Sequence, residues 1–205
     1  MKRITQSALA LTVLATLSLA AHAESTFQST TGSGALNATA RVDFRINIPR
    51  ILFLQVGTGT LFGSNAAVDL IDFNVPAADV GNGTAVAATA GSGDLGNGVV
   101  TARVRGNGGS VGLTATTGGA LSNGAGGTIS FGQITTTSNN ASFGAPVLVD
   151  GAASGTVTVA ANGLGIVNQD AQWTYAYEND NVVPGGTYGG VNLNNGRVTY
   201  TASLP

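Results

Sequence analysis

Residues 36–48, LNATARVDFRINI, decide the fold class of this 205-residue chain. Even-numbered positions in the stretch are apolar and odd-numbered positions are polar, over thirteen residues. An alternation with a period of two is typical of a β-strand that has one covered face and one solvent-facing side. A shift of the pairing by one residue would expose the whole apolar face, so we expect a strongly specified register. The apolar side chains are Leu36, Ala38, Ala40, Val42, Phe44, Ile46 and Ile48.

The rest of the chain reads as short strands separated by turns. Pro49 interrupts the first ladder, because proline has no N–H, and a denser apolar run follows at 51–56. Asn-Gly occurs six times at irregular spacing, which indicates turns and not a repeat of fixed period. About nine strands in this pattern predict an all-β antiparallel sandwich with Greek-key connections. The further strands are expected at 68–75, 99–105, 111–116, 128–135, 145–149, 155–160, 173–177 and 197–202, the second and third joined as a hairpin through Gly106-Asn107-Gly108-Gly109.

The N-terminus has the layout of an export signal. Lys2 and Arg3 precede an apolar stretch, Ala8 to Ala21, and Ala21-His22-Ala23 is a small-x-small cleavage pattern. The stretch is shorter than the roughly 20 apolar residues of a membrane-spanning helix. We therefore expect residues 1–23 to be removed, and the mature chain to be exported without a membrane span. The expected plan is a polar extension at 24–35 and one sandwich domain at 36–205.

Composition excludes much chemistry in the expected mature chain. Residues 24–205 contain no His, Lys, Cys or Met, and six Arg stand against ten Asp and Glu. Nucleophilic catalysis built on His or Cys is excluded, as are imidazole or thiolate metal sites. A net negative chain with scattered Arg has no electrostatic footprint for nucleic acid. We expect no enzyme activity, no cofactor and no nucleic-acid partner.

Two clusters are candidate binding sites. Trp173, Tyr175 and Tyr177 alternate along one strand, where they form either an aromatic platform for sugar or ordinary packing, and packing is favoured. The run Glu178-Asn179-Asp180-Asn181 carries oxygen ligands of the kind that Ca²⁺ accepts. Its spacing matches no calcium loop, so a polar turn is the favoured interpretation and no metal site is assigned.

In layout, the mature chain resembles bacterial fimbrial subunits with an immunoglobulin-like fold. The likeness is carried by the polar tail and long alternating strand after the signal, by the glycine-rich turn at 104–111 and by Ile129-Ser130-Phe131. It also lies in Pro184-Gly185-Gly186-Thr187-Tyr188 and the closing strand 198–202. Two features depart from that family: the chain has no cysteine for a disulfide, and its last tyrosine is Tyr200, five residues before Pro205, whereas a penultimate tyrosine is usual.

The resemblance implies a structural role at the cell surface. In such families a subunit lacks one strand, and an N-terminal extension of a neighbour fills the groove by strand addition. The implied partners are other copies, related subunits and a periplasmic chaperone, and the implied location is the periplasm, a surface fimbrium or the medium. Leu36 to Ile48 is the candidate donor, although the first strand of its own sandwich is the favoured interpretation. A secreted or surface binding module of carbohydrate or adhesin type is the alternative function.

Overall fold

The computed structural model describes residues 24–205, so the expected signal at 1–23 lies outside the described residues. The chain divides into an N-terminal unit that ends at Ile48 and a compact unit from Pro49 to Pro205, which we call the domain. The described part of the N-terminal unit has no assigned strand. The predicted sandwich boundary at residue 36 therefore differs from the boundary of the compact unit, which lies at Pro49.

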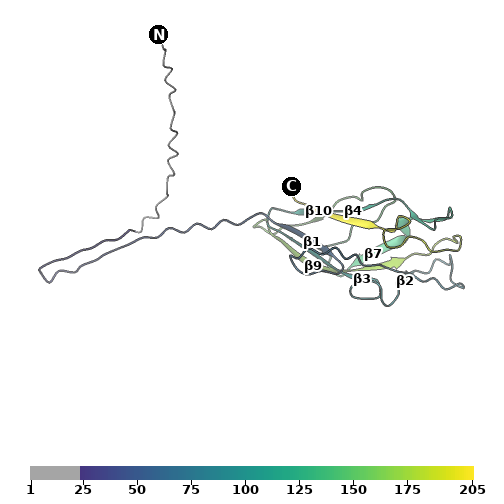
Figure 1. The fold of residues 1–205 in the computed structure, drawn as a ribbon, viewed down its shortest axis with the longest axis horizontal. Helices are drawn as coiled ribbons and strands as arrows, with labels where there is room; N and C mark the ends of the chain where they lie inside the picture. The colour runs from purple at the N-terminus through teal and green to yellow at the C-terminus, as the bar shows by residue number, and fades with distance from the viewer. Residues whose placement is uncertain (1–23) are drawn as a thin grey trace, which may run out of the picture. The chain divides into compact units, whose positions relative to one another are not determined.

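The regular secondary structure of the domain is almost entirely antiparallel β-strand (Figure 1). Its larger sheet has the order β1-β3-β9-β2, and β7 pairs with β9 as well. A smaller sheet has the order β10-β4-β8, and β5 and β6 form a two-stranded ribbon. The all-β antiparallel prediction is confirmed. The elements are β1 (Leu52–Val56), β2 (Val86–Ala87), β3 (Val99–Gly106), β4 (Val111–Thr117), β5 (Leu121–Ser122), β6 (Thr128–Ile129), the 3-10 turn η1 (Phe131–Gln133), β7 (Ile134–Ser138), β8 (Val157–Val159), β9 (Val167–Tyr177) and β10 (Val198–Ser203).

The core lies between the two larger sheets. Inward side chains of β3 and β9, among them Val104 and Trp173, pack with Val111 and Leu113 of β4, and all four are fully buried. The Trp173 indole contacts the ring of Phe143 edge-on at a centroid distance of 5.3 Å, and its Nε1 donates to the Phe143 carbonyl at 3.2 Å. The polar tip of this large side chain is therefore satisfied inside the core.

The predicted hairpin at 99–116 is wrong. β3 pairs with β1 and β9, whereas β4 pairs with β10 and β8, so the turn after Gly106 crosses from one sheet to the other. A two-residue type I′ hairpin needs a positive φ at both central residues. In the described chain, Gly109 is the one residue of 107–110 with a positive φ. The Asn107 side chain instead binds the main chain of residues 49 and 51.

Two predicted strands, at 68–75 and 145–149, are irregular segments in the structure. Around Asp72, the main chain bonds to Thr89 N and to the Ser92 hydroxyl instead of to a neighbouring strand. In the second segment, Pro146 has no N–H to give to a ladder. Both segments still turn apolar side chains such as Phe73 and Leu148 toward the core. In these two segments, the alternation of apolar and polar residues therefore reflects burial of one face, although no strand pairing occurs.

Among residues 24–205, the structure contains no helix with the length and apolar character needed to cross a membrane.

Candidate functional site: an apolar groove and an unpaired arm

The domain has a large open groove beside its core. Its volume is about 1290 Å³, which exceeds the roughly 300–1,000 Å³ of a typical small-molecule site. The lining comes from β1, from the irregular segment 67–75, from the first half of β10 and from the loop before it. Apolar side chains make up much of the wall, including Leu54, Val56, Ile71, Phe73, Phe131 and Tyr200. The groove is therefore shaped for a chain segment more than for a small molecule.

Two strand edges border this groove. β1 pairs with β3 on one side, and β10 pairs with β4 on one side; in the described part of the chain, neither has a second partner strand. A strand edge of this kind presents a row of N–H and C=O groups to any extended segment that reaches it. The groove thus combines apolar side-chain pockets with main-chain donors and acceptors, which is what β-strand addition requires.

The inward side chains of β10 are incompletely covered. Val198, Tyr200 and Ala202 turn inward but are only half-buried, whereas the inward residues of the adjacent β4 are fully buried. β4 is the central strand of this sheet and β10 is an edge strand, so the free edge of β10 leaves its inward side chains less covered. Apolar surface on β10 remains for another segment to cover.

A pair of tyrosine hydroxyls lies in the wall of the groove. The Tyr175 and Tyr200 hydroxyls are 2.7 Å apart, and each ring contributes to the groove lining. Burial raises the pKa of Tyr200 to about 12, and burial beside Tyr200 raises the pKa of Tyr175 well above its usual value. Both phenols are therefore neutral at ordinary pH, and each satisfies the other within an apolar surface.

The groove and the start of the domain lie at different places along the strands. The groove is lined by Phe53 to Gly57, which takes in all of β1 except Leu52, and by Arg197 to Tyr200 at the start of β10. The opposite end of β10 leads to Pro205, whose carbonyl accepts a hydrogen bond from Arg50, just before β1. The chain therefore enters the domain at the end of β10 that lies away from the groove, and it reaches the groove lining at Phe53 of β1.

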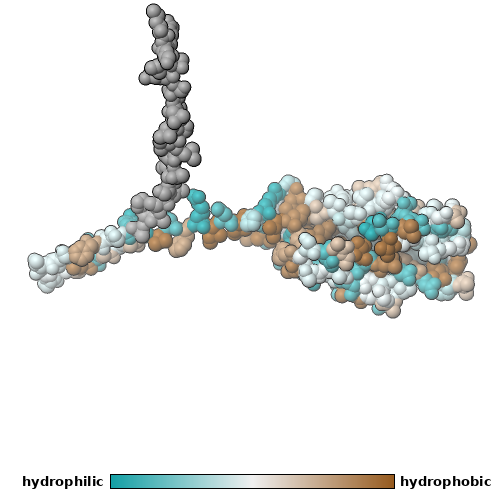
Figure 2. All heavy atoms as spheres, viewed as in Figure 1, coloured by the Kyte–Doolittle hydropathy of each residue, from teal (hydrophilic) through white to brown (hydrophobic). Residues whose placement is uncertain are grey.

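The segment that precedes the domain exposes its apolar side chains. We call residues 36–48 the arm. Phe44 is 90% exposed, Ile46 83% and Ile48 79%. The sheets of the described chain begin at Leu52, so the arm is not the first strand of its own sandwich in this structure. Figure 2 shows brown apolar atoms along this part of the chain and on the surface of the domain.

Polar contacts within the N-terminal unit bring residues 24–26 alongside residues 39–41. The Thr26 hydroxyl donates to the Thr39 carbonyl at 2.9 Å, and Arg41 binds Glu24 through two hydrogen bonds of 2.6 and 2.9 Å. The Arg41 guanidinium lowers the pKa of the Glu24 carboxyl. The pair is exposed to solvent, so it contributes little to stability. It uses polar side chains of the arm and leaves the apolar ones uncovered.

The candidate aromatic platform is buried. Trp173 has no exposed surface, and Tyr175 and Tyr177 are 7% and 6% exposed. Burial of Trp173 counts against a sugar-binding face, since stacking needs an accessible ring. The structure places the two tyrosines, but not the tryptophan, in the wall of the groove.

The candidate calcium run holds two loops together. Asn179 is buried and has a positive φ of 58°. Its side chain accepts from Gly81 N at 2.9 Å and donates to the Asp79 carbonyl at 2.7 Å, and Asp180 is held by Gln133. Within residues 24–205, no group of three His, Cys, Asp or Glu side chains is placed to hold a metal ion. The geometry is that of a structural turn.

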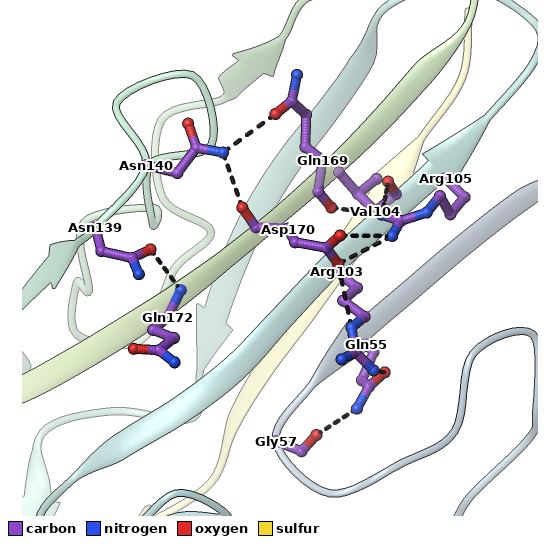
Figure 3. Close-up of polar contacts among 10 residues, drawn as sticks. All are labelled: Gln55, Gly57, Arg103, Val104, Arg105, Asn139, Asn140, Gln169, Asp170 and Gln172. Carbon is purple, nitrogen blue, oxygen red and sulfur yellow. Dashed lines mark hydrogen bonds and ion pairs between the residues drawn. The ribbon is translucent and has the colours of Figure 1, made fainter.

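The outward face of the larger sheet carries a polar network (Figure 3). The Asp170 carboxylate accepts from Arg103 at 3.1 Å and from Arg105 at 2.8 Å. Arg103 also reaches Gln55 on β1, and the Asn140 amide donates to the Asp170 carbonyl at 2.8 Å. Two guanidinium groups share one carboxylate in this network, which ties β1, β3 and β9 across their outward face. The network is structural, since its donors and acceptors serve one another.

The resemblance to fimbrial subunits implied a groove, but the residues that line it were not predicted from the sequence. Its lining residues are ordinary inward positions of strands and loops, and nothing local marks them as uncovered. The one signal available was the arm, whose length and alternation indicated an apolar face that some sheet must cover. Comparison with known proteins adds no guide, because no family model, curated protein or solved structure matches the chain.

Proposed function

We propose that this chain is an exported, non-enzymatic structural subunit of a surface fibre, in which the arm of one copy fills the groove of the next. One observation carries the proposal. The domain keeps an apolar groove between two unpaired strand edges, while the same chain carries a strand-length segment with one uncovered apolar face. The groove lacks a strand to cover it, and the arm lacks a sheet to cover its apolar face.

Strand addition provides the binding chemistry. The main chain of the arm would pair with the free edges of β1 and β10, and alternate side chains would enter the groove. Burial of one large apolar side chain contributes roughly 1.5–3 kcal/mol. Val42, Phe44, Ile46 and Ile48 are all strongly exposed and fall on one face, so they act together.

The proposed binding of an arm in the groove of another copy is a heterologous contact, because two different surfaces meet. The arm joins the domain at Pro49, and the groove is lined by β1 and by the first half of β10. Heterologous contacts that do not close a ring build open filaments.

The proposal also includes export of the chain and protection of its groove by a chaperone before assembly. The basic, apolar and small-residue pattern of residues 1–23 supports removal of a signal peptide. Free strand edges invite uncontrolled pairing with other chains, so a periplasmic chaperone that covers the groove before assembly is an expected partner. The layout shared with fimbrial subunits of immunoglobulin-like fold supports the same role and a location on the cell surface.

Assembly of the exported protein tests the proposal. The protein is purified after expression with its leader and examined by size exclusion and negative-stain microscopy. We expect ladders or filaments for the natural chain and monomers for the double variant Phe44→Asp/Ile46→Asp, because a charge on this face cannot enter an apolar groove. Arg45→Ser, on the polar face, is the control and assembles normally. A natural chain that stays monomeric at all concentrations contradicts the proposal and favours a binding module.

A further inference from the structure

We propose that Asn162 and Gly163 form a site of spontaneous covalent modification, at which the side-chain amide of Asn162 is converted to a carboxylate. The sequence contains six Asn-Gly pairs, and in each of them the glycine places no side chain beside the nitrogen that would attack the amide. The surroundings of the pair at 162–163, in the loop between β8 and β9, differ from those of the other five. This inference does not depend on the proposed function.

The reaction consumes water and no other reagent. The Gly163 nitrogen gives its proton to water and attacks Cγ of Asn162, which closes a five-membered succinimide ring between neighbouring groups. Negative charge gathers on Oδ1, and the bond from Cγ to Nδ2 then breaks, so that Nδ2 leaves as ammonia. A water molecule opens the ring at either carbonyl and leaves aspartate or isoaspartate. The net change is one amide and one water converted to one carboxylic acid and one ammonia.

The loop stabilises the charge that develops on Oδ1 of Asn162. This oxygen accepts from the Leu164 N–H at 3.0 Å and from the Ile166 N–H at 2.9 Å. Two main-chain donors directed at one carbonyl oxygen form the arrangement of an oxyanion hole. The Asn162 N–H also donates to the Ile166 carbonyl at 2.9 Å, so the loop holds these donors in place before the reaction begins.

Both reacting nitrogens at this site are open to solvent. Asn162 and Gly163 are exposed. Neither the Gly163 N–H nor Nδ2 of Asn162 donates a hydrogen bond to another group within residues 24–205. The nitrogen that attacks and the nitrogen that leaves are therefore both free to do so without breaking a contact of the fold.

In the other five pairs, hydrogen bonds hold one of the reacting nitrogens. The glycine N–H donates to a main-chain carbonyl in three of them: Gly83 to Asn179, Gly98 to Ser92 and Gly196 to Leu193. In a fourth pair the Asn107 amide is bound at both ends, by the Pro49 carbonyl and by the Ile51 N–H. Each of these contacts must break before the ring can close, which slows the reaction.

The fifth pair, Asn123 and Gly124, is a matched comparison. Oδ1 of Asn123 also accepts two main-chain N–H groups, from Ala125 and Gly127, each at 2.9 Å. The Gly124 N–H, however, donates to the Ser122 hydroxyl at 3.0 Å. The two sites therefore share the donors to Oδ1 and differ in whether the attacking nitrogen is free.

Conversion rates in the folded and the unfolded protein test the assignment. The full exported chain is kept at mildly alkaline pH with and without urea, and tandem mass spectrometry measures conversion at each of the six asparagines. In urea all six should convert at comparable rates, because each is followed by glycine. In the folded protein Asn162 should convert at least as fast as in urea, whereas the other five should slow about tenfold, because a hydrogen bond must break first.

Two variants separate the contributions. Ser122→Ala frees the Gly124 N–H and should speed conversion of Asn123 in the folded protein about tenfold. Gly163→Ala should slow conversion of Asn162 about tenfold, because its methyl group crowds the attacking nitrogen. A Cβ at position 163 meets no atom within 4 Å, so this variant should keep the fold. The near-UV signal of the buried Trp173 checks that each variant is folded.

The assignment is overturned if Asn162 converts no faster than the other five asparagines in the folded protein. It is also overturned if Asn123 keeps its natural rate in folded Ser122→Ala. Should Ser122→Ala not fold, the natural chain and Gly163→Ala decide the question. Fibre assembly is scored separately, so fibres formed by a chain whose Asn162 stays unmodified would support the proposed function and contradict this inference alone.

Discussion

The arm and strand β3 carry the same pattern and have opposite surroundings. Both alternate with a period of two, yet the inward residues Val100, Ala102 and Val104 of β3 are 3% exposed or less, whereas Phe44 and Ile46 of the arm are more than 80% exposed. The alternation in each segment shows that one of its faces is suited to burial. It does not record which chain provides the cover, and that choice decides between a self-contained domain and a polymer.

A charge placed on each apolar face gives the largest expected contrast. Val104→Asp puts a carboxylate among fully buried side chains and should cost more than about 4 kcal/mol of unfolding free energy, enough to unfold much of the protein. Phe44→Asp should leave that free energy unchanged and abolish assembly. Thermal unfolding followed through the buried Trp173, together with size exclusion, measures both effects.

If Phe44→Asp lowered the unfolding temperature as much as Val104→Asp does, the arm would be part of the core. Arg45→Asp, next to Phe44 on the polar face, separates the effect of position from that of charge.

Alkaline pH should lower the unfolding free energy of the domain and leave the arm unchanged, and this contrast is smaller than that from the charge substitutions. Burial raises the pKa of Tyr200 to about 12, from 10.0 in an unfolded chain, and raises the pKa of Tyr175 as well. Because the folded state holds these protons more tightly, the unfolding free energy should be constant below about pH 10 and fall as the pH rises toward 12. The arm contains no tyrosine, so its exposure should not change through this ionisation.

Urea unfolding between pH 8 and pH 12 checks this behaviour. Tyr200→Phe should flatten the curve, and an equally steep loss in that variant would show that other groups control the alkaline limit.

Alternation predicted the elements whose register is set by the core. β3, β4 and β10 lie close to their predicted ranges, because inward and outward residues differ clearly in each, whereas β9 begins at Val167, well before the predicted start at Trp173. The hairpin at 99–116 was missed because Asn107 uses its amide on residues 49 and 51, a long-range contact that turn composition does not reveal. The segment around Asp72 was predicted as a strand, since apolar alternation persists where the main chain bonds to Thr89 and Ser92.

Of the two parts of the candidate site, only the arm could be predicted from the residues themselves. The arm was visible in the sequence, since its seven alternating apolar residues need cover. The groove was not visible, because it exists only where β1 and β10 lack a neighbouring strand, and a missing partner leaves no mark on the residues that remain. Tyr175 and Tyr177 were noted as an aromatic row, and their place in the groove wall depends on the same missing cover.

Cross-linking between two copies tests the central claim most directly. One copy carries Phe44→Cys, and the other carries a single cysteine in the groove, at Val56, Ile71 or Val198; Arg45→Cys replaces Phe44→Cys as the control. The account predicts an intermolecular disulfide from position 44 to at least one groove position under assembly conditions, and far less from position 45. No disulfide at any groove position, or equal cross-linking from positions 44 and 45, would contradict it.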